Sequence, residues 1–172
     1  IDKSEISEDQ RHHGPKPYLL PDFNLLGYNY RMTDLQGAVG VVQLSKLNKL
    51  ITERQKWAEF YTRELRDVKW IITPKTPDNC KHSWQSYVTI VNEELSPGTR
   101  NEIMEKLQKN GISTRPGTHA IHMLNYYKEK FNLNNSDFLG AQSANNFSMA
   151  IPLHNRMKYE DFQYVVDKIK NL

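Results

Sequence analysis

The feature that most constrains this chain is a polar and aromatic loop, Gly27 to Gln36, that runs directly into a long segment of helical periodicity. Thr33 and Gln36 have the spacing of a capping box, in which the hydroxyl accepts from the amide three residues on and the Gln side chain reaches back. We therefore expect a helix to begin near Asp34, with partial positive charge at its first turn.

Two side chains just upstream of that helix start, Asn29 and Arg31, are suited to bind an anion. A helix N-terminus flanked by a neutral donor and a guanidinium favours phosphate. Helix starts also carry polar residues for capping alone, so a structural alternative stays open. In that alternative Arg31 pairs with Asp34 and Asn29 stabilises a turn.

The apolar pattern continues well beyond the capping box. Apolar residues recur at near-helical spacing over 33–50 and again over 52–66, which predicts two consecutive helices or one bent helix. The first stretch contains Gly37, Ala38 and Gly40. Because Gly costs about 1 kcal/mol relative to Ala inside a helix, we interpret these small residues as permitting close packing against another helix or a second subunit.

The rest of the chain predicts a small mixed domain. β-Branched and aromatic residues indicate strands at 70–72, 84–91, 112–115 and 148–151. Cap and stop residues predict helices from Ser96-Pro97 to Asn110-Gly111 and over 137–146 behind Ser136, and apolar residues on one face predict a last helix over 159–170. A short helical or irregular loop is expected over 119–127. Helices segregated onto a small, largely antiparallel sheet define an α+β fold.

Composition narrows the classes of function. The single Cys80 excludes an internal disulfide and fits a reducing compartment. A formal net charge of +3, from 23 Lys and Arg against 20 Asp and Glu, is too small to indicate nucleic-acid binding. The sequence has no run of 18 apolar residues and no signal-peptide pattern. We therefore expect a cytoplasmic protein without nucleic-acid or membrane partners.

The histidines raise the question of a metal site. His119 and His122 lie three residues apart, and Cys80 with His82 could complete four zinc ligands. The Cys-x-His spacing is unusual for zinc, however, and the other pair follows Gly117 in a loop. We therefore predict no metal site.

Arg115 lies in the same loop region and offers a planar fork to phosphate oxygens. Its alternative role is a surface ion pair with Glu102 or Glu105 of the preceding helix, which would contribute little. For His119 the alternative is a loop histidine satisfied by backbone groups.

The run from Leu26 to Leu44 resembles the signature of the DegT/DnrJ/StrS family of pyridoxal-phosphate (PLP) sugar aminotransferases. Three later segments resemble the same family in the same order. These are a small-domain strand at 82–88, a substrate-side loop at 115–122 with Tyr126-Tyr127, and a closing strand at 149–154. The resemblance covers roughly residues 20 to 172.

This resemblance implies the C-terminal domain of a fold-type-I PLP enzyme that moves an amino group from a donor such as glutamate to a nucleotide-linked keto sugar. Family active sites lie at the interface of a homodimer. Asn29 then reaches the PLP phosphate of the neighbouring subunit and Arg31 is a second cofactor-binding residue. The substrate-binding residues implied are Arg115, His119 and His122.

One family feature has no counterpart here. The lysine that holds PLP covalently lies on the large domain, before the loop that contains Asn29. We therefore assign no catalytic residue, and expect an arm and connection over 1–32, interface and linking helices over 33–66, and a small domain over 67–172. Such a piece would be inactive alone. The alternatives are a non-catalytic binding or assembly module, and a PLP-dependent sugar dehydratase in which histidine replaces the lysine.

Overall fold

The computed structural model describes Leu26, Tyr28 and residues 30–172. The chain divides into two compact units, Ile1–Val42 and Gln43–Leu172. Asn29 and most of the expected arm lie outside the described residues. The division into 1–32, 33–66 and 67–172 stays a prediction.

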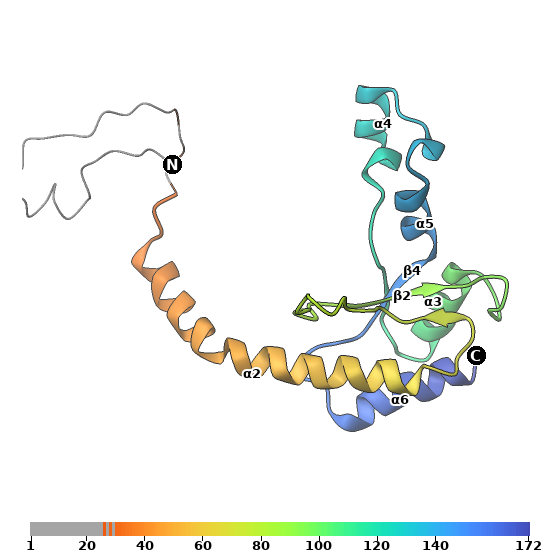
Figure 1. The fold of residues 1–172 in the computed structure, drawn as a ribbon, viewed down its shortest axis with the longest axis horizontal. Coiled ribbons are helices and arrows are strands. Elements are labelled where there is room, and N and C mark those ends of the chain that lie inside the picture. The colour runs from red at the N-terminus through yellow and green to blue at the C-terminus, as the bar shows by residue number, and fades with distance from the viewer. Residues whose placement is uncertain (1–25, 27, 29) are drawn as a thin grey trace, which may run out of the picture. The chain divides into compact units, whose positions relative to one another are not determined.

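Helix α2 spans Asp34–Glu64 and is continuous (Figure 1). The expected capping box is present at its start. The Gln36 amide donates to Thr33 Oγ1 at 3.3 Å, and the Thr33 amide donates to Gln36 Oε1 at 3.0 Å. These bonds confirm the predicted start at Asp34, and one helix forms rather than two.

The unit Gln43–Leu172 contains a four-stranded antiparallel sheet in the order β1-β2-β4-β3. Its strands are β1 (Ile71–Ile72), β2 (Tyr87–Val91), β3 (Arg115–Pro116) and β4 (Ser148–Ile151). Tyr87 pairs with Ile151 in the register between β2 and β4. Alternation along β2 buries Tyr87, Thr89 and Val91 on one face, whereas Val88 and Ile90 on the other face are half-buried.

Four further α-helices and two 3₁₀ turns complete this unit. They are α3 (Arg100–Lys109), η1 (Ile121–Met123), α4 (Asn125–Phe131), η2 (Asn135–Phe138), α5 (Leu139–Phe147) and α6 (Tyr159–Lys170). The C-terminal part of α2 lies beside α6 (Figure 1), and α3 adds Ile103 and Leu107 to the same core. The predicted α+β class is confirmed.

Aromatic side chains form the contact between α2 and α6. The Trp57 and Phe162 rings stack with centroids 4.2 Å apart, and Tyr61 is fully buried beside them. The Tyr61 hydroxyl donates to the Pro152 carbonyl at 2.8 Å, so its one polar group is satisfied. Burial raises the pKa of Tyr61 above its usual range and that of Tyr87 to about 12. Both phenols therefore stay neutral at physiological pH.

The predicted start of α3 at Ser96-Pro97 was wrong. The N-cap is Thr99, whose hydroxyl accepts from the Glu102 amide at 3.3 Å while the Glu102 carboxylate accepts from the Thr99 amide at 2.8 Å. These bonds to Thr99 lower the pKa of Glu102. The Ser96 hydroxyl instead donates to the Gly98 carbonyl within the preceding turn. The predicted stop is correct, since Asn110 is the C-cap and Gly111 has φ +74°.

Three other predicted boundaries were also wrong. The strand expected at 112–115 begins only at Arg115. Ser136 is not a cap, because Asn134 and Asp137 form the capping box of a 3₁₀ turn ahead of α5. The strand expected from Trp84 begins at Tyr87, since Trp84 has φ +50° and cannot continue a strand.

Arg54 of α2 joins three segments that are distant in sequence. Its Nη1 donates to the carbonyls of Trp84 at 2.9 Å and Gln85 at 2.8 Å, and its Nε donates to Asn155 Oδ1 at 3.0 Å. One guanidinium thereby fixes the segment before β2 and the segment after β4 against the helix.

Replacing Arg54 with Met should lower the free energy of unfolding by about 2–3 kcal/mol, because two carbonyls and an amide lose a charged donor. Urea denaturation followed by far-UV circular dichroism measures this change. Arg66→Met is the matched control, since Arg66 is exposed in the turn that follows α2, and it should stay within about 0.5 kcal/mol. Equal losses in both variants would contradict the bridging role of Arg54.

Candidate functional site

The loop that carries three of the predicted site residues leaves the sheet at its edge strand, β3. Arg115 pairs with Ala150 of β4, and its side chain is exposed. In the turn that follows, a Cβ on Gly117 would lie 2.7 Å from Ser148 Cβ, which is too close for two carbon atoms. The backbone can therefore approach β4 at this point only because residue 117 is glycine. The Gly117 amide also donates to the Ser148 carbonyl at 3.2 Å. The loop therefore starts from a fixed point on the sheet.

Arg115 does not form the surface pair considered as its alternative. Within the described residues it has no ion pair with Glu102 or Glu105. Glu102 is engaged instead in the capping box of α3. Within the described residues the guanidinium of Arg115 is thus exposed and has no ion pair.

His122 and His119 differ in environment. His122 lies in η1, is only 5% exposed, and has its Nε2 3.0 Å from the Asn135 carbonyl oxygen. Its ring packs against Phe138 at a centroid distance of 5.1 Å. His119 is exposed. A histidine bonded to a backbone group, which was the alternative considered for His119, is therefore found at His122 instead.

The predicted cofactor-binding residues belong to the other unit. Arg31 is exposed and lies two residues before the capping box of α2, whereas Asn29 lies outside the described residues. A guanidinium beside the positive end of a 31-residue helix fits the phosphate of PLP. The donor chemistry at this end of the chain is thus compatible with the cofactor.

Tyr126 and Tyr127, which accompany the substrate-side loop in the family resemblance, are exposed on α4. Their exposed fractions are 62% and 40%, and their rings meet edge to face at 5.2 Å. Lys130 donates to the Tyr126 hydroxyl at 2.9 Å. Both side chains are therefore available to a partner or ligand beside the loop.

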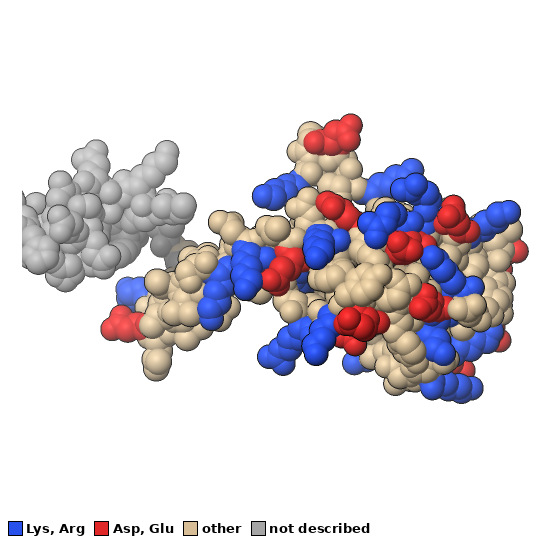
Figure 2. Space-filling model, turned by 90° about the horizontal axis from the view of Figure 1, so that it is seen from below, with Lys and Arg blue, Asp and Glu red and all other residues tan. Residues whose placement is uncertain are grey.

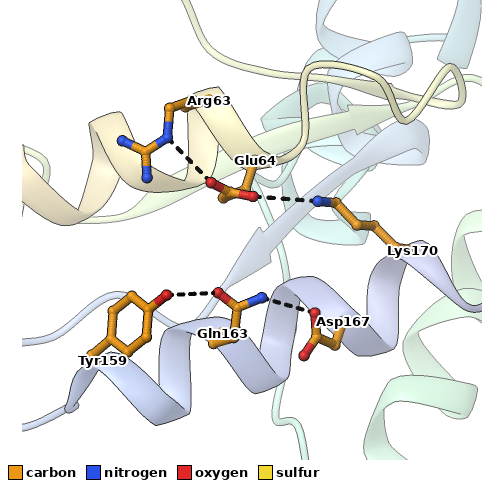
Figure 3. Close-up of polar contacts among 6 residues, drawn as sticks. All are labelled: Arg63, Glu64, Tyr159, Gln163, Asp167 and Lys170. Atoms are coloured by element: carbon orange, nitrogen blue, oxygen red, sulfur yellow. Dashed lines mark hydrogen bonds and ion pairs between the residues drawn. The ribbon is translucent and has the colours of Figure 1, made fainter.

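Charged side chains of both signs are interspersed over the face shown in Figure 2. Two ion pairs meet at Glu64, which lies 3.1 Å from Arg63 Nε and 3.3 Å from Lys170 Nζ (Figure 3). The hydrogen bond from Arg63, followed by that from Lys170, lowers the pKa of Glu64. These contacts tie the end of α2 to the end of α6.

Neither a metal cluster nor a membrane helix is found among the described residues. No group of three or more His, Cys, Asp or Glu side chains is placed to hold an ion there. In the same residues no helix combines the length and the apolar character needed to cross a bilayer.

The family model described as the DegT/DnrJ/EryC1/StrS aminotransferase family matches residues 5–170. The spore coat polysaccharide biosynthesis protein SpsC of Bacillus subtilis is 29% identical over 147 residues, which are 85% of this chain and 38% of SpsC. The UDP-4-amino-4,6-dideoxy-N-acetyl-beta-L-altrosamine transaminase of Campylobacter jejuni is 29% identical over 174 residues, covering 98% of this chain and 44% of the transaminase.

Comparison with solved structures shows that the chain shares its fold with aminotransferases. Spr1654 of Streptococcus pneumoniae, a candidate sugar aminotransferase solved in its PLP form, superposes with a TM-score of 0.76 at 21% identity. The match covers 95% of this chain and 41% of Spr1654. The chain therefore spans less than half the length of the relatives it matches.

Replacing His122 with Ala should lower the free energy of unfolding by about 1–3 kcal/mol, because the Asn135 carbonyl loses its partner. Equilibrium unfolding in urea measures the loss. His119→Ala removes the same side chain from an exposed position and should cost less than about 0.5 kcal/mol. If the two variants are equally stable, the hydrogen bond of His122 is not structural.

Proposed function

The chain belongs to the DegT/DnrJ/EryC1/StrS aminotransferase family, and we propose on this basis that it forms the C-terminal part of a cytoplasmic, PLP-dependent enzyme. This enzyme transfers an amino group from an amino acid such as glutamate to a nucleotide-linked keto sugar. The observation that carries the proposal is the family match over residues 5–170. The similarity to a transaminase of a UDP-linked amino sugar supports the substrate class.

PLP, when bound, supplies the electron sink for amino-group transfer, and the protein supplies binding and orientation. In this chain Asn29 and Arg31 would bind the cofactor phosphate at the start of α2, with the guanidinium as a charged fork. Arg115, His119 and His122 would orient the sugar nucleotide. We expect the family's PLP-binding lysine to lie outside these 172 residues, because none of their lysines lies in its motif. We therefore expect no transfer by this chain alone.

The exposed apolar side chains in the first turns of α2 support the proposal that the enzyme is a homodimer. Leu35, Val39 and Val42 follow one another at helical spacing and are 80%, 59% and 50% exposed. A contiguous row of exposed apolar side chains indicates a surface that a partner covers. In the family that partner is a second subunit, and Asn29 would then serve the cofactor of that subunit.

In the complete enzyme, replacing Asn29 with Ala should weaken PLP affinity about 10- to 150-fold, because the phosphate loses a hydrogen-bond donor worth about 1.5–3 kcal/mol. Equilibrium dialysis of the apoenzyme with PLP measures this. Asn134→Ala provides an amide deletion outside the assigned residues and should retain wild-type affinity. Unchanged affinity in Asn29→Ala would rule out the assigned contact.

In the complete enzyme, replacing Arg115 with Ala should lower kcat/KM about tenfold or more for the sugar nucleotide and leave the amino-donor half-reaction near wild type. The two half-reactions are measured separately by rapid mixing. Arg156→Ala, which removes another exposed arginine, should change neither. Equal losses of rate in both half-reactions would indicate that the loop containing Arg115 has a structural role and does not bind the sugar nucleotide.

A further inference from the structure

A hollow of about 580 Å³ lies between the C-terminal part of α2 and the connection from β1 to β2. We call it the cationic hollow and define it by its charged and ionisable lining residues: Glu59, Arg63, Arg66, Lys75, Lys81 and His82. All of them belong to the single unit Gln43–Leu172. None of them is among the residues assigned above to cofactor or substrate.

Positive charge exceeds negative charge in the lining of the cationic hollow. Four cationic side chains and one carboxylate, Glu59, line it, and Glu59 accepts a hydrogen bond from Gln55 at 3.2 Å. Arg63 has its counter-charge in Glu64, outside the hollow, whereas within the described residues Arg66, Lys75 and Lys81 have neither an ion pair nor a hydrogen bond. Cations that line one hollow without counter-charges repel one another, so an anion placed among these three lowers the electrostatic free energy.

Arg63 retains donors for a ligand although it is paired. Its Nε donates to Glu64 at 3.1 Å, and Figure 3 shows its two terminal nitrogens directed away from that carboxylate. A guanidinium anchored through Nε is held in one orientation, which reduces the entropy lost when its other nitrogens bind an anion.

The aromatic wall of the cationic hollow supplies another donor. The Trp84 amide donates to His82 Nδ1 at 2.8 Å, so the neutral imidazole carries its hydrogen on Nε2. The two rings lie 4.2 Å apart, which fixes the imidazole against the indole. His82 therefore presents an N–H donor in a defined direction.

Trp84 itself is held in an unfavourable backbone conformation. Its φ of +50° lies in the left-handed region, which costs a bulky residue about 1–3 kcal/mol. The hydrogen bond from Arg54 to the Trp84 carbonyl keeps the residue there. Strain of this kind gathers at ligand-binding segments, where the fold maintains a conformation that a ligand requires.

We propose that the cationic hollow binds a compact phosphate-bearing anion of the size of pyrophosphate or of the diphosphate of a nucleotide. Its volume lies within the range of small-molecule sites. Guanidinium and ammonium groups are the side chains that recognise phosphate oxygens, and the imidazole N–H adds a neutral donor. This inference does not rest on the proposed aminotransferase activity.

The direct test is a calorimetric titration of the chain with inorganic pyrophosphate at low ionic strength and pH 7. Replacing both Lys75 and Lys81 with Ala should weaken the affinity about tenfold or more, because two charge-assisted contacts are lost. The matched control replaces Lys109 and Lys128, which removes the same charge elsewhere, and should stay within about twofold. A parallel titration with ADP identifies the source of the phosphate: equal affinities indicate a bare phosphate site, and tighter ADP binding indicates a nucleotide site.

The alkylation rate of Cys80 reports independently whether an anion occupies the cationic hollow. It is the single cysteine of the chain, it is exposed, and it lines the cationic hollow. Pyrophosphate should slow its alkylation by iodoacetamide in the wild-type chain, as followed by intact mass, and should not slow it in the Lys75 and Lys81 double variant. The proposal is overturned by absence of heat and of protection at about 1 mM pyrophosphate. It is equally overturned by the same loss of affinity in both double variants.

Discussion

The packing of α2 against α6 is the contact on which the domain depends. Stacking of Trp57 on Phe162 and complete burial of Tyr61 remove large apolar surfaces from water, and each such ring contributes about 1.5–3 kcal/mol. Tyr61 also contacts the ring of Tyr87 at 5.2 Å, so the helix pair is joined directly to β2. Because β4 pairs with β2, and β3 with β4, this aromatic contact helps to position the loop that contains Arg115.

Local signals in the sequence predicted the elements whose determinants are themselves local. The Thr33 and Gln36 capping box located the start of α2, and apolar periodicity located α6 at Tyr159–Lys170. The errors arose where two local signals competed. Ser96-Pro97 has the composition of a helix start, but Thr99 with Glu102 forms the complete capping box and takes that role. Strand ends were misplaced because they depend on pairing with distant segments, as Trp84 illustrates with its positive φ.

In the candidate site, too, features set by local sequence could be predicted, whereas features that depend on contacts between distant segments could not. The family resemblance proposed Arg115 and His122 as substrate-binding residues. The sequence alone could not predict that Arg115 is exposed, whereas the His122 ring is hydrogen-bonded to the Asn135 carbonyl. The bridge made by Arg54 and the cationic hollow were both missed. Arg63 and Lys81 are 18 residues apart and belong to no motif, so only the folded chain brings them to one cavity. Arg54 likewise joins partners 30 and 101 residues away.

The glycines of α2 lead to a further consequence for the assembled protein. Gly37 and Gly40 lie inside the helix, where each costs about 1 kcal/mol relative to alanine. In the described part of the chain a Cβ on Gly40 would meet nothing within 4 Å, and one on Gly37 would meet only Met32 Sδ at 4.0 Å. No contact there requires a glycine, so the described residues do not compensate the cost. Close approach of another surface would compensate it, and the apolar row containing Val39 lies on the same turns. Low helix propensity and exposed apolar surface thus have one common explanation in the proposed subunit contact.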